Sequence, residues 1–170
     1  MEVKNATVFI TGASRGLGLE FAREAVRRGA KKVYAGMRNI TGFNEPGISP
    51  IQIDVTDRAS IAAAAKVAAD TTLLINNAGI AALIEGPLAV DTETQSQQMF
   101  DTNYYGVVRV SQAFEGVLTT KSHAAIINVL SDIVWLPRPY LTPYAASKAA
   151  AWSFTNQLRF HLKERNIHVL

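Results

Sequence analysis

Residues 6–18 read ATVFITGASRGLG, an apolar run that passes directly into a loop with three glycines. The run Ala6–Thr11 is rich in β-branched and aromatic residues, which favours a β-strand. The stretch Gly16–Arg28 that follows the loop is typical of a helix. A strand joined to a helix by a glycine-rich turn indicates the first unit of a parallel α/β sheet.

Short β-branched runs alternate with longer helical stretches along the rest of the chain, which predicts a parallel sheet covered by helices. Further strands are expected at Lys32–Met37, Ile51–Asp54, Thr72–Asn76 and Ala124–Leu130, and the opening of a sixth at Ile167–Leu170. Further helices are expected at Asp57–Ala69, about Ser96–Leu118, and Pro143–Arg165. The expected fold is α/β, a three-layer doubly wound parallel sheet of the Rossmann type, in one domain that covers residues 1–170.

The composition is that of a globular chain, because 48% of the 170 residues are hydrophobic and 18% are charged. No apolar run approaches the roughly 18 residues of a membrane span, and the N-terminus has no signal-peptide pattern. The absence of cysteine excludes disulfides and thiol catalysis and leads us to expect a cytoplasmic location. A net charge of +3 with scattered basic residues gives no support to nucleic-acid binding. His123, His161 and His168 lack metal-ligand spacing, so no metal site is expected.

The glycine loop has the spacing G-x-x-x-G-x-G, which favours binding of a dinucleotide. Glycines let the backbone turn tightly and let a pyrophosphate approach the helix N-terminus, whose free N–H groups and dipole attract an anion. A plain strand-to-helix turn is the alternative interpretation. The cofactor-binding residues expected in this loop are Gly12, Ser14, Arg15, Gly16, Leu17 and Gly18.

The end of the second expected strand bears on which cofactor is bound. An NAD-binding fold usually places a carboxylate there, about 20 residues beyond the loop, to bind the ribose 2′-hydroxyl. This chain has Arg38 at that point and no carboxylate, and Arg15 is a second cation. Two guanidiniums suit a 2′-phosphate, so NADP is expected in preference to NAD. The alternative is that both arginines are solvated surface residues.

The third expected strand ends at Asp54, followed by Val55, where an adenine ring would lie. Both residues are therefore candidates for cofactor binding. An equally good alternative for Asp54 is an N-terminal cap for the helix that begins near Asp57.

The run NNAG closes the fourth expected strand and is expected to border the cofactor. Its candidate binding residues are Asn77, Ala78 and Gly79. Asparagine amides can bind neighbouring backbone, and glycine permits a close approach. The alternative is a generic turn.

The run YAASKAA at residues 144–150 indicates acid-base chemistry. Tyr144 and Lys148 are one helical turn apart, so both lie on one face of the last helix. A phenol with a pKa of about 10 is a poor catalyst at neutral pH, and a neighbouring cation favours its phenolate and brings the pKa closer to neutrality. Thr142 is expected to cap this helix, with Pro143 as its first residue. Ser131 follows the fifth expected strand, at the edge where open α/β sheets bind ligands.

The third expected helix contains a polar residue in an apolar stripe. Met99, Asn103, Val107, Val110 and Phe114 share one face. A buried amide needs hydrogen-bond partners, and leaving it without them costs about 1–3 kcal/mol. Asn103 is therefore either a support for catalysis or a structural asparagine that binds a neighbouring strand.

With TGASRGLG, NNAG, Asn103, Ser131, Tyr144 and Lys148 in this order, the chain resembles the short-chain dehydrogenase/reductase family over all 170 residues. The resemblance implies that these four side chains form the catalytic group. Tyr144 would protonate a carbonyl oxygen as hydride arrives from the nicotinamide, and Ser131 would hold that oxygen. Lys148 would lower the pKa of Tyr144, and both residues are expected to contact the cofactor. Asn103 would hold a water that links Lys148 to solvent.

Members of that family continue beyond a sixth strand, so the resemblance implies that the chain is C-terminally incomplete. It would lack the last strand or strands of the family fold and be truncated at the start of strand six. The chain would then be either a fragment of a longer protein or a naturally shortened form. Leu130 also replaces the serine that usually precedes the catalytic one.

Apolar residues cover most of the circumference of the fourth expected helix, and a second buried face favours a subunit contact. These residues are Ala151, Trp152, Phe154, Leu158, Phe160 and Leu162. The resemblance implies a homodimer or homotetramer through the third and fourth helices. Extra packing within the core is the alternative.

The expected function is NADP-dependent hydride transfer to or from a small-molecule carbonyl/alcohol substrate, with Tyr144 as general acid/base. A non-catalytic dinucleotide-binding or regulatory protein is the first alternative. An epimerase or dehydratase that shares the Tyr-xxx-Lys pair is the second.

Overall fold

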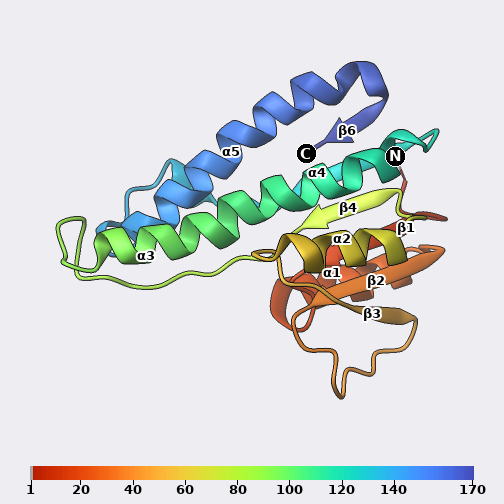
Figure 1. Cartoon of the computed structure of the whole chain (residues 1–170), viewed down its shortest axis with the longest axis horizontal. Helices are drawn as coiled ribbons and strands as arrows, with labels where there is room; N and C mark the ends of the chain where they lie inside the picture. The colour runs from red at the N-terminus through yellow and green to blue at the C-terminus, as the bar shows by residue number, and fades with distance from the viewer. Residues whose placement is uncertain (1) are drawn as a thin grey trace.

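A computed structural model describes residues 2–170, and within them six parallel strands form one sheet in the order β3-β2-β1-β4-β5-β6. Figure 1 shows β3, β2, β1 and β4 following one another across the sheet. The strands are β1 (Thr7–Thr11), β2 (Lys32–Met37), β3 (Ile48–Gln52), β4 (Leu73–Asn76), β5 (Ala124–Asn128) and β6 (Ile167–Val169). The helices are α1 (Gly16–Arg27), α2 (Arg58–Val67), α3 (Thr92–Met99), α4 (Gly106–Thr119) and α5 (Thr142–Leu162). A π-helical segment, η1 (Phe100–Tyr105), joins α3 to α4, and the single-turn 3₁₀ segments are η2 (Asp132–Val134), η3 (Pro139–Leu141) and η4 (Lys163–Arg165).

Side chains of β1 show how the sheet is covered on both faces. Val8 and Ile10 pack on one side with Ala22 of α1. Phe9 points to the other side, where it packs with Phe114 of α4. Continuous burial on both faces is what a parallel sheet between two helical layers requires. The predicted three-layer, doubly wound Rossmann-type fold is therefore confirmed.

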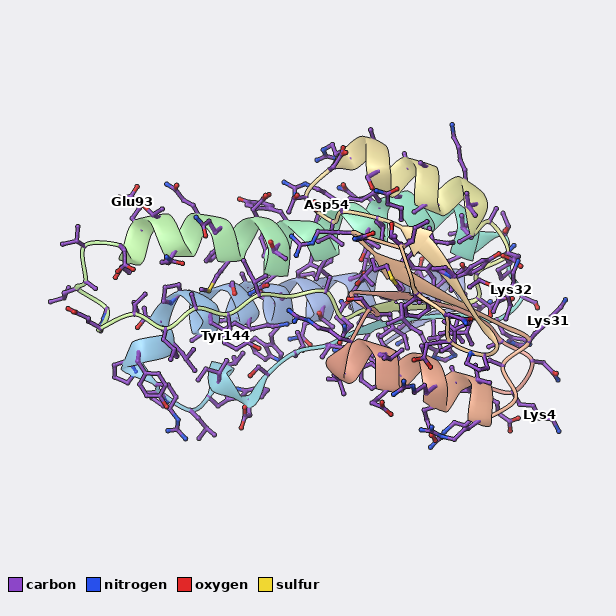
Figure 2. All side chains as sticks on the ribbon, turned by 90° about the horizontal axis from the view of Figure 1, so that it is seen from below. Lys4, Lys31, Lys32, Asp54, Glu93 and Tyr144 are labelled. Carbon is purple, nitrogen blue, oxygen red and sulfur yellow. The ribbon has the colours of Figure 1, made fainter. Side chains whose placement is uncertain are left out.

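The strand order reverses beside β1, since β2 lies on one side of it and β4 on the other. In open α/β sheets the crevice at such a point, outside the carboxyl ends of the strands, is the usual ligand site. The glycine loop and the NNAG run leave the sheet at this point. Figure 2 shows Asp54 and Tyr144 lying away from Lys4, Lys31 and Lys32, which gather at the opposite end of the molecule.

The third strand begins and ends earlier than predicted, at Ile48–Gln52 rather than Ile51–Asp54. Pro50 lies inside it, opposite Ala35 of β2. A proline in a strand indicates a break, but β3 is an edge strand, where the missing N–H removes no ladder bond.

The predicted helix at Ser96–Leu118 is three segments, because α3 starts at Thr92 and η1 separates it from α4. The apolar stripe from Met99 to Phe114 is buried as predicted, with Asn103 fully inside η1. At the start of α4, a Cβ on Gly106 would lie 3.0 Å from Cγ2 of Val55. The glycine thus lets α4 approach the loop after β3.

The last helix begins at Thr142, one residue before the prediction, and Leu141 occupies the cap position. The hydroxyl of Thr142 donates a 2.7 Å hydrogen bond back to the carbonyl oxygen of Pro139. It therefore belongs to the preceding turn, and the N-cap prediction for Thr142 is wrong. Figure 1 shows α5 lying beside the α3–α4 run, both extending beyond the carboxyl edge of the sheet.

Candidate active site

The glycine loop after β1 adopts a conformation that its glycines make possible. Gly12 and Gly16 have φ values of 68° and 57°, in the left-handed region. A Cβ on Gly12 would lie 2.8 Å from Cα of Ala78, and one on Gly18 would lie 2.4 Å from the Gly12 carbonyl oxygen. The first turn of α1, the loop and the NNAG run are thus in direct contact, with no room for a side chain between them.

Hydrogen bonds hold the NNAG run against the glycine loop. The Asn77 amide donates to the carbonyl oxygens of Thr11 and Gly12, at 3.0 and 3.1 Å. In return the Thr11 hydroxyl accepts from the backbone N–H groups of Asn77 and Ala78, both at 3.0 Å. Thr11 was not among the residues predicted for the site. Thr11 ends the first strand directly before Gly12, and this position could have indicated that it contributes to the site.

Within residues 2–170, no side chain forms a hydrogen bond with the N-terminus of α1. Arg15 occupies the cap position with extended backbone and makes no side-chain cap hydrogen bond, and the first turn contains no acidic residue. The first N–H groups of a helix lack partners within the helix and carry partial positive charge. This end of α1 can therefore receive an anion.

A cavity of about 440 Å³ opens at this point. Twelve predicted cofactor-binding residues line it, namely Gly12, Ser14, Arg15, Gly16, Leu17, Gly18, Arg38, Asp54, Val55, Asn77, Ala78 and Gly79. Met37, Ile53, Thr56, Ile80 and Thr102 complete its wall. The structure thus brings together residues from the ends of β1, β2, β3 and β4, whereas Tyr144 and Lys148 lie outside this wall.

The two arginines of the cavity have no acidic partner within residues 2–170. Neither Arg15 nor Arg38 donates a side-chain hydrogen bond to a carboxylate there, although Arg38 lies near enough to Asp54 to contribute to its lowered pKa. An unpaired guanidinium retains its full capacity to bind an incoming phosphate. The cavity therefore carries two cations available to a ligand.

Asp54 is held by its own turn rather than by a helix. Its carboxylate accepts from the backbone N–H and the hydroxyl of Thr56, at 2.9 and 2.7 Å. The N–H bond is the main cause that lowers the pKa of Asp54, with the hydroxyl bond next and the charge of Arg38 adding to it. Asp57 caps α2 by accepting from Ala59 at 2.8 Å. The alternative role of Asp54 as the cap of that helix is therefore wrong.

Lys148 lies almost fully buried, with 5% of its surface exposed. Its ammonium donates a 2.7 Å hydrogen bond to the carbonyl oxygen of Val129, just beyond β5, and lies 5.9 Å from the centroid of the Tyr144 ring. Burial lowers the pKa of Lys148. The structure thus places a desolvated cation beside the phenol, as the one-turn spacing predicts.

Ser131 follows Val129 by two residues and caps the N-terminus of the short segment η2. Its hydroxyl oxygen accepts a 3.3 Å hydrogen bond from the backbone N–H of Ile133. Ser131 is half-buried, so its hydroxyl can meet a ligand at the carboxyl edge of β5. Tyr144 is likewise half-buried in the first turn of α5.

Asn103 is fully buried and its amide is occupied by three bonds. Its oxygen accepts from the backbone N–H of Ile80 at 2.8 Å. Its nitrogen donates to the Ile80 carbonyl oxygen at 2.9 Å and to the hydroxyl of Ser147 at 3.0 Å. The residue therefore connects η1, the loop after β4 and α5. Its role in holding a water stays a prediction.

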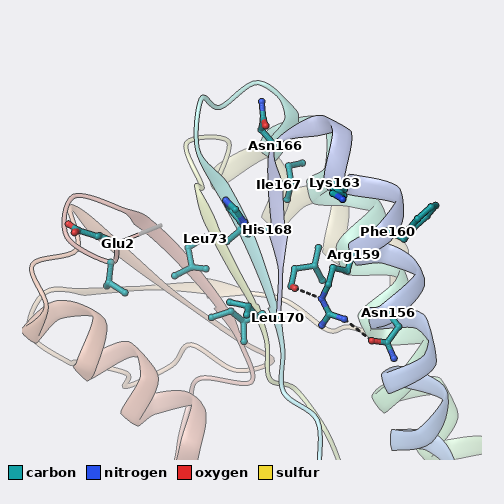
Figure 3. A pocket seen from close by; sticks show the side chains of 14 residues that line it. Glu2, Leu73, Asn156, Arg159, Phe160, Lys163, Asn166, Ile167, His168 and Leu170 are labelled. Carbon is teal, nitrogen blue, oxygen red and sulfur yellow. Dashed lines mark hydrogen bonds between the residues drawn. The ribbon is translucent and has the colours of Figure 1, made fainter.

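A larger cavity, of about 790 Å³, lies elsewhere. Figure 3 shows it between α5 and the strands β4 and β6, with Leu73, His168 and Leu170 facing Asn156 and Arg159. Arg159 donates to the Val169 carbonyl oxygen and to the Asn156 side chain, at 2.8 and 2.7 Å. None of the predicted site residues lines it. The smaller cavity is the better candidate, because the glycine loop and the open helix N-terminus converge on it.

Two predicted absences concern metals and membranes. Across residues 2–170 no three His, Asp or Glu side chains gather in a group that could hold a metal ion. In the same part of the chain no helix is both long and apolar enough to cross a membrane.

Comparison with known proteins identifies the family of this fold and loop pattern. Residues 6–170 match the family described as short chain dehydrogenase. An oxidoreductase called DltE from Bacillus subtilis (strain 168) is 31% identical across 100% of this chain and 71% of its own length. The NADPH-dependent 1-acyldihydroxyacetone phosphate reductase of Schizosaccharomyces pombe is 34% identical across 95% of this chain and 56% of its own length.

A solved structure is similar throughout the chain. It is a short chain dehydrogenase from Burkholderia cenocepacia J2315 in complex with NADP, 36% identical, with a TM-score of 0.92. The likeness covers 100% of this chain and 72% of that one. With the family match across nearly its whole length, the chain belongs to the short-chain dehydrogenase/reductase family of oxidoreductases.

Proposed function

We propose that the protein transfers a hydride between NADP(H) and a small carbonyl/alcohol substrate, with Tyr144 as general acid/base. The observation that carries this proposal is the buried Lys148 ammonium, held at 2.7 Å by the Val129 carbonyl and lying 5.9 Å from the Tyr144 ring centroid. Burying a cation without an ionic partner is costly. Stabilisation of a Tyr144 phenolate would explain why the Lys148 ammonium is buried at this position.

The residues of the 440 Å³ cavity fit a dinucleotide. A side chain at Gly12 or Gly18 would collide with the neighbouring backbone, so the loop leaves its N–H groups open to a pyrophosphate. Arg15 and Arg38 would bind the ribose 2′-phosphate, and Asp54 with Val55 would border the adenosine. When bound, NADPH supplies the hydride.

NADP is proposed over NAD because Arg38 occupies the end of β2, where a carboxylate would bind a free 2′-hydroxyl. The similar protein from Burkholderia cenocepacia is in complex with NADP, and the Schizosaccharomyces pombe reductase is named as NADPH-dependent. The cofactors named for these two relatives carry the 2′-phosphate that Arg15 and Arg38 would bind in this chain.

In the reducing direction, hydride supplied by bound NADPH to the carbonyl carbon would leave the electron pair of the C=O bond on the oxygen. The Tyr144 hydroxyl gives that oxygen its proton, and Ser131 donates a hydrogen bond to it. The Lys148 ammonium stabilises the phenolate that remains. Solvent then returns a proton to Tyr144, and the reverse sequence oxidises an alcohol.

The α3–α4 run and α5 are the proposed contact surface of a homodimer or homotetramer. Tyr105, Trp152 and Phe160 are large apolar side chains exposed on these helices. Exposed apolar groups on neighbouring helices favour burial against another subunit. The cytoplasmic location and the single-domain organisation stay predictions.

The deciding experiment compares wild-type protein with Tyr144→Phe, using NADPH affinity by fluorescence titration and turnover across a panel of ketones and quinones. Loss of the phenolic proton should lower kcat/KM by about 100-fold or more while leaving the NADPH Kd nearly unchanged. Tyr140→Phe, which removes a hydroxyl from an exposed tyrosine of η3, is the matched control. Full turnover by Tyr144→Phe would defeat the assignment. NADPH binding by wild type without turnover would support a non-catalytic dinucleotide-binding protein instead.

A further inference from the structure

Ser147 is fully buried in α5, between Tyr144 and Lys148 in the chain. Its hydroxyl makes two hydrogen bonds. It accepts from the Asn103 amide at 3.0 Å and donates to the Tyr144 carbonyl oxygen at 2.8 Å. A buried hydroxyl with both capacities used is fixed in orientation.

The direction of these bonds follows from Ile80. Asn103 bonds both the N–H and the carbonyl oxygen of Ile80, so its oxygen must face the N–H and its nitrogen must face the carbonyl. This leaves one amide hydrogen, which points to Ser147. Ser147 must therefore accept from Asn103, and its own hydrogen remains for Tyr144.

The chain of bonds connects the two halves of the site. Ile80 lines the dinucleotide cavity, Asn103 lies in the π-helical segment η1, and Tyr144 lies in the first turn of α5. π-helical insertions occur often at functional sites, because they turn a side chain away from its regular helical direction. Here the segment contains the amide that reaches both the loop and α5.

We propose that Ser147 is a positioning residue, which holds the first turn of α5, and with it the Tyr144 phenol, in fixed register with the Ile80 loop. This inference rests on the proposed function for its meaning in catalysis. A helical serine that bonds the preceding turn is common and by itself only bends a helix. The bond from a fully buried Asn103 is what makes Ser147 a link between elements.

Ser111 of α4 is the matched control, because it is also a buried serine that accepts from a buried asparagine amide. It accepts from Asn76 at 3.2 Å and, within residues 2–170, makes no hydrogen bond to the first turn of α5. Ser111→Ala and Ser147→Ala thus remove the same kind of bond. They differ in whether the lost bond leads to Tyr144.

The test measures NADPH Kd, kcat on one ketone and the Tyr144 Cζ resonance in protein labelled with ¹³C-tyrosine. The chain has five tyrosines, and Tyr144→Phe assigns the relevant signal. Ser147→Ala should lower kcat by about 10- to 100-fold at unchanged NADPH Kd, and should shift or broaden the Tyr144 resonance. Ser111→Ala should change neither kcat nor the Tyr144 resonance. Ser147→Cys, whose thiol keeps a weak donor and acceptor, should retain an intermediate kcat.

A double-mutant cycle with Asn103→Ala separates a link from two independent effects. If Ser147 acts through Asn103, the losses in kcat should fall well short of additive. Additive losses, or an unchanged Tyr144 resonance in Ser147→Ala, would overturn the inference. If wild-type protein reduces no ketone, the proposed function fails, while the resonance still decides whether Ser147 positions the phenol.

Discussion

Lys148 donates a 2.7 Å hydrogen bond from its ammonium to the carbonyl oxygen of Val129. The bond joins α5 to the segment that leads from β5 to Ser131, so the acid-base helix and the proposed oxyanion donor share one fixed point. Among the described residues no carboxylate forms an ion pair with this ammonium. Within residues 2–170 the ammonium is thus held by a carbonyl dipole and not by a carboxylate, and it lies 5.9 Å from the Tyr144 ring centroid.

Replacing Lys148 with methionine should lower turnover and should change how the stability of the protein depends on pH. Turnover should fall by about 100-fold or more, because no cation remains to stabilise the phenolate. Burial lowers the pKa of Lys148 below 10.5 in the folded protein, so between that lowered value and 10.5 the unfolded chain binds more protons. Wild-type stability should thus rise relative to Lys148→Met as pH increases through this window. Urea unfolding of both proteins from pH 7 to 10.5 tests this, and a pH-independent difference would contradict it.

Removing the guanidinium at the end of β2 should change the preference between cofactors. Arg38→Ala should weaken NADPH binding by about 10- to 100-fold, the range of one charged hydrogen-bonded contact, and leave NADH binding nearly unchanged. Arg58→Ala, which removes an exposed guanidinium outside the cavity, is the control. Fluorescence titration with both nucleotides gives the ratio. An equal loss of affinity for NADPH and NADH would show that Arg38 does not bind the 2′-phosphate.

Two helical glycines should respond in opposite directions to the same substitution. Alanine at Gly18 would place a Cβ 2.4 Å from the Gly12 carbonyl oxygen, so Gly18→Ala should destabilise the fold by about 1–3 kcal/mol and weaken NADPH binding. A Cβ on Gly116 of α4 would meet no atom within 4 Å, so Gly116→Ala should stabilise by about 0.5–1 kcal/mol. Thermal unfolding measures both. A stabilising Gly18→Ala would show that the loop and NNAG are not in the contact described.

The order of strands and helices could be predicted because local patterns determine it. β1 and its loop combine a β-branched run with a glycine-rich turn into a helix, and the later units repeat the alternation of strand and helix. Element ends were harder. Pro50 disfavours a strand in the sequence, and β3 tolerates it because β3 lies at the edge of the sheet. The polar turns at the start of α3 gave no apolar periodicity to reveal Thr92.

The candidate site was predicted where residue type itself limits the chemistry, as for Tyr144, Lys148 and the loop glycines. Ser147 and Thr11 were missed because their bonds join residues far apart in the chain. Asn103 lies 44 residues before Ser147, and Thr11 lies 66 before Asn77. The π-helical turn was also hidden, because Met99, Asn103 and Val107 keep a regular helical spacing across it, with Asn103 inside the turn.

The bonds between Thr11 and Asn77 use only groups of the chain itself, and the backbone of Ala78 lies against Gly12. One wall of the cavity is therefore held in shape by the chain's own contacts. A preorganised wall loses little conformational entropy on binding, so more of the interaction energy appears as affinity. Few substitutions of the glycines Gly12 and Gly18 are therefore compatible with this packing, because a new side chain would deform both the glycine loop and the NNAG run. Arg38 is exposed, so a substitution there can change which nucleotide is bound without disturbing that packing.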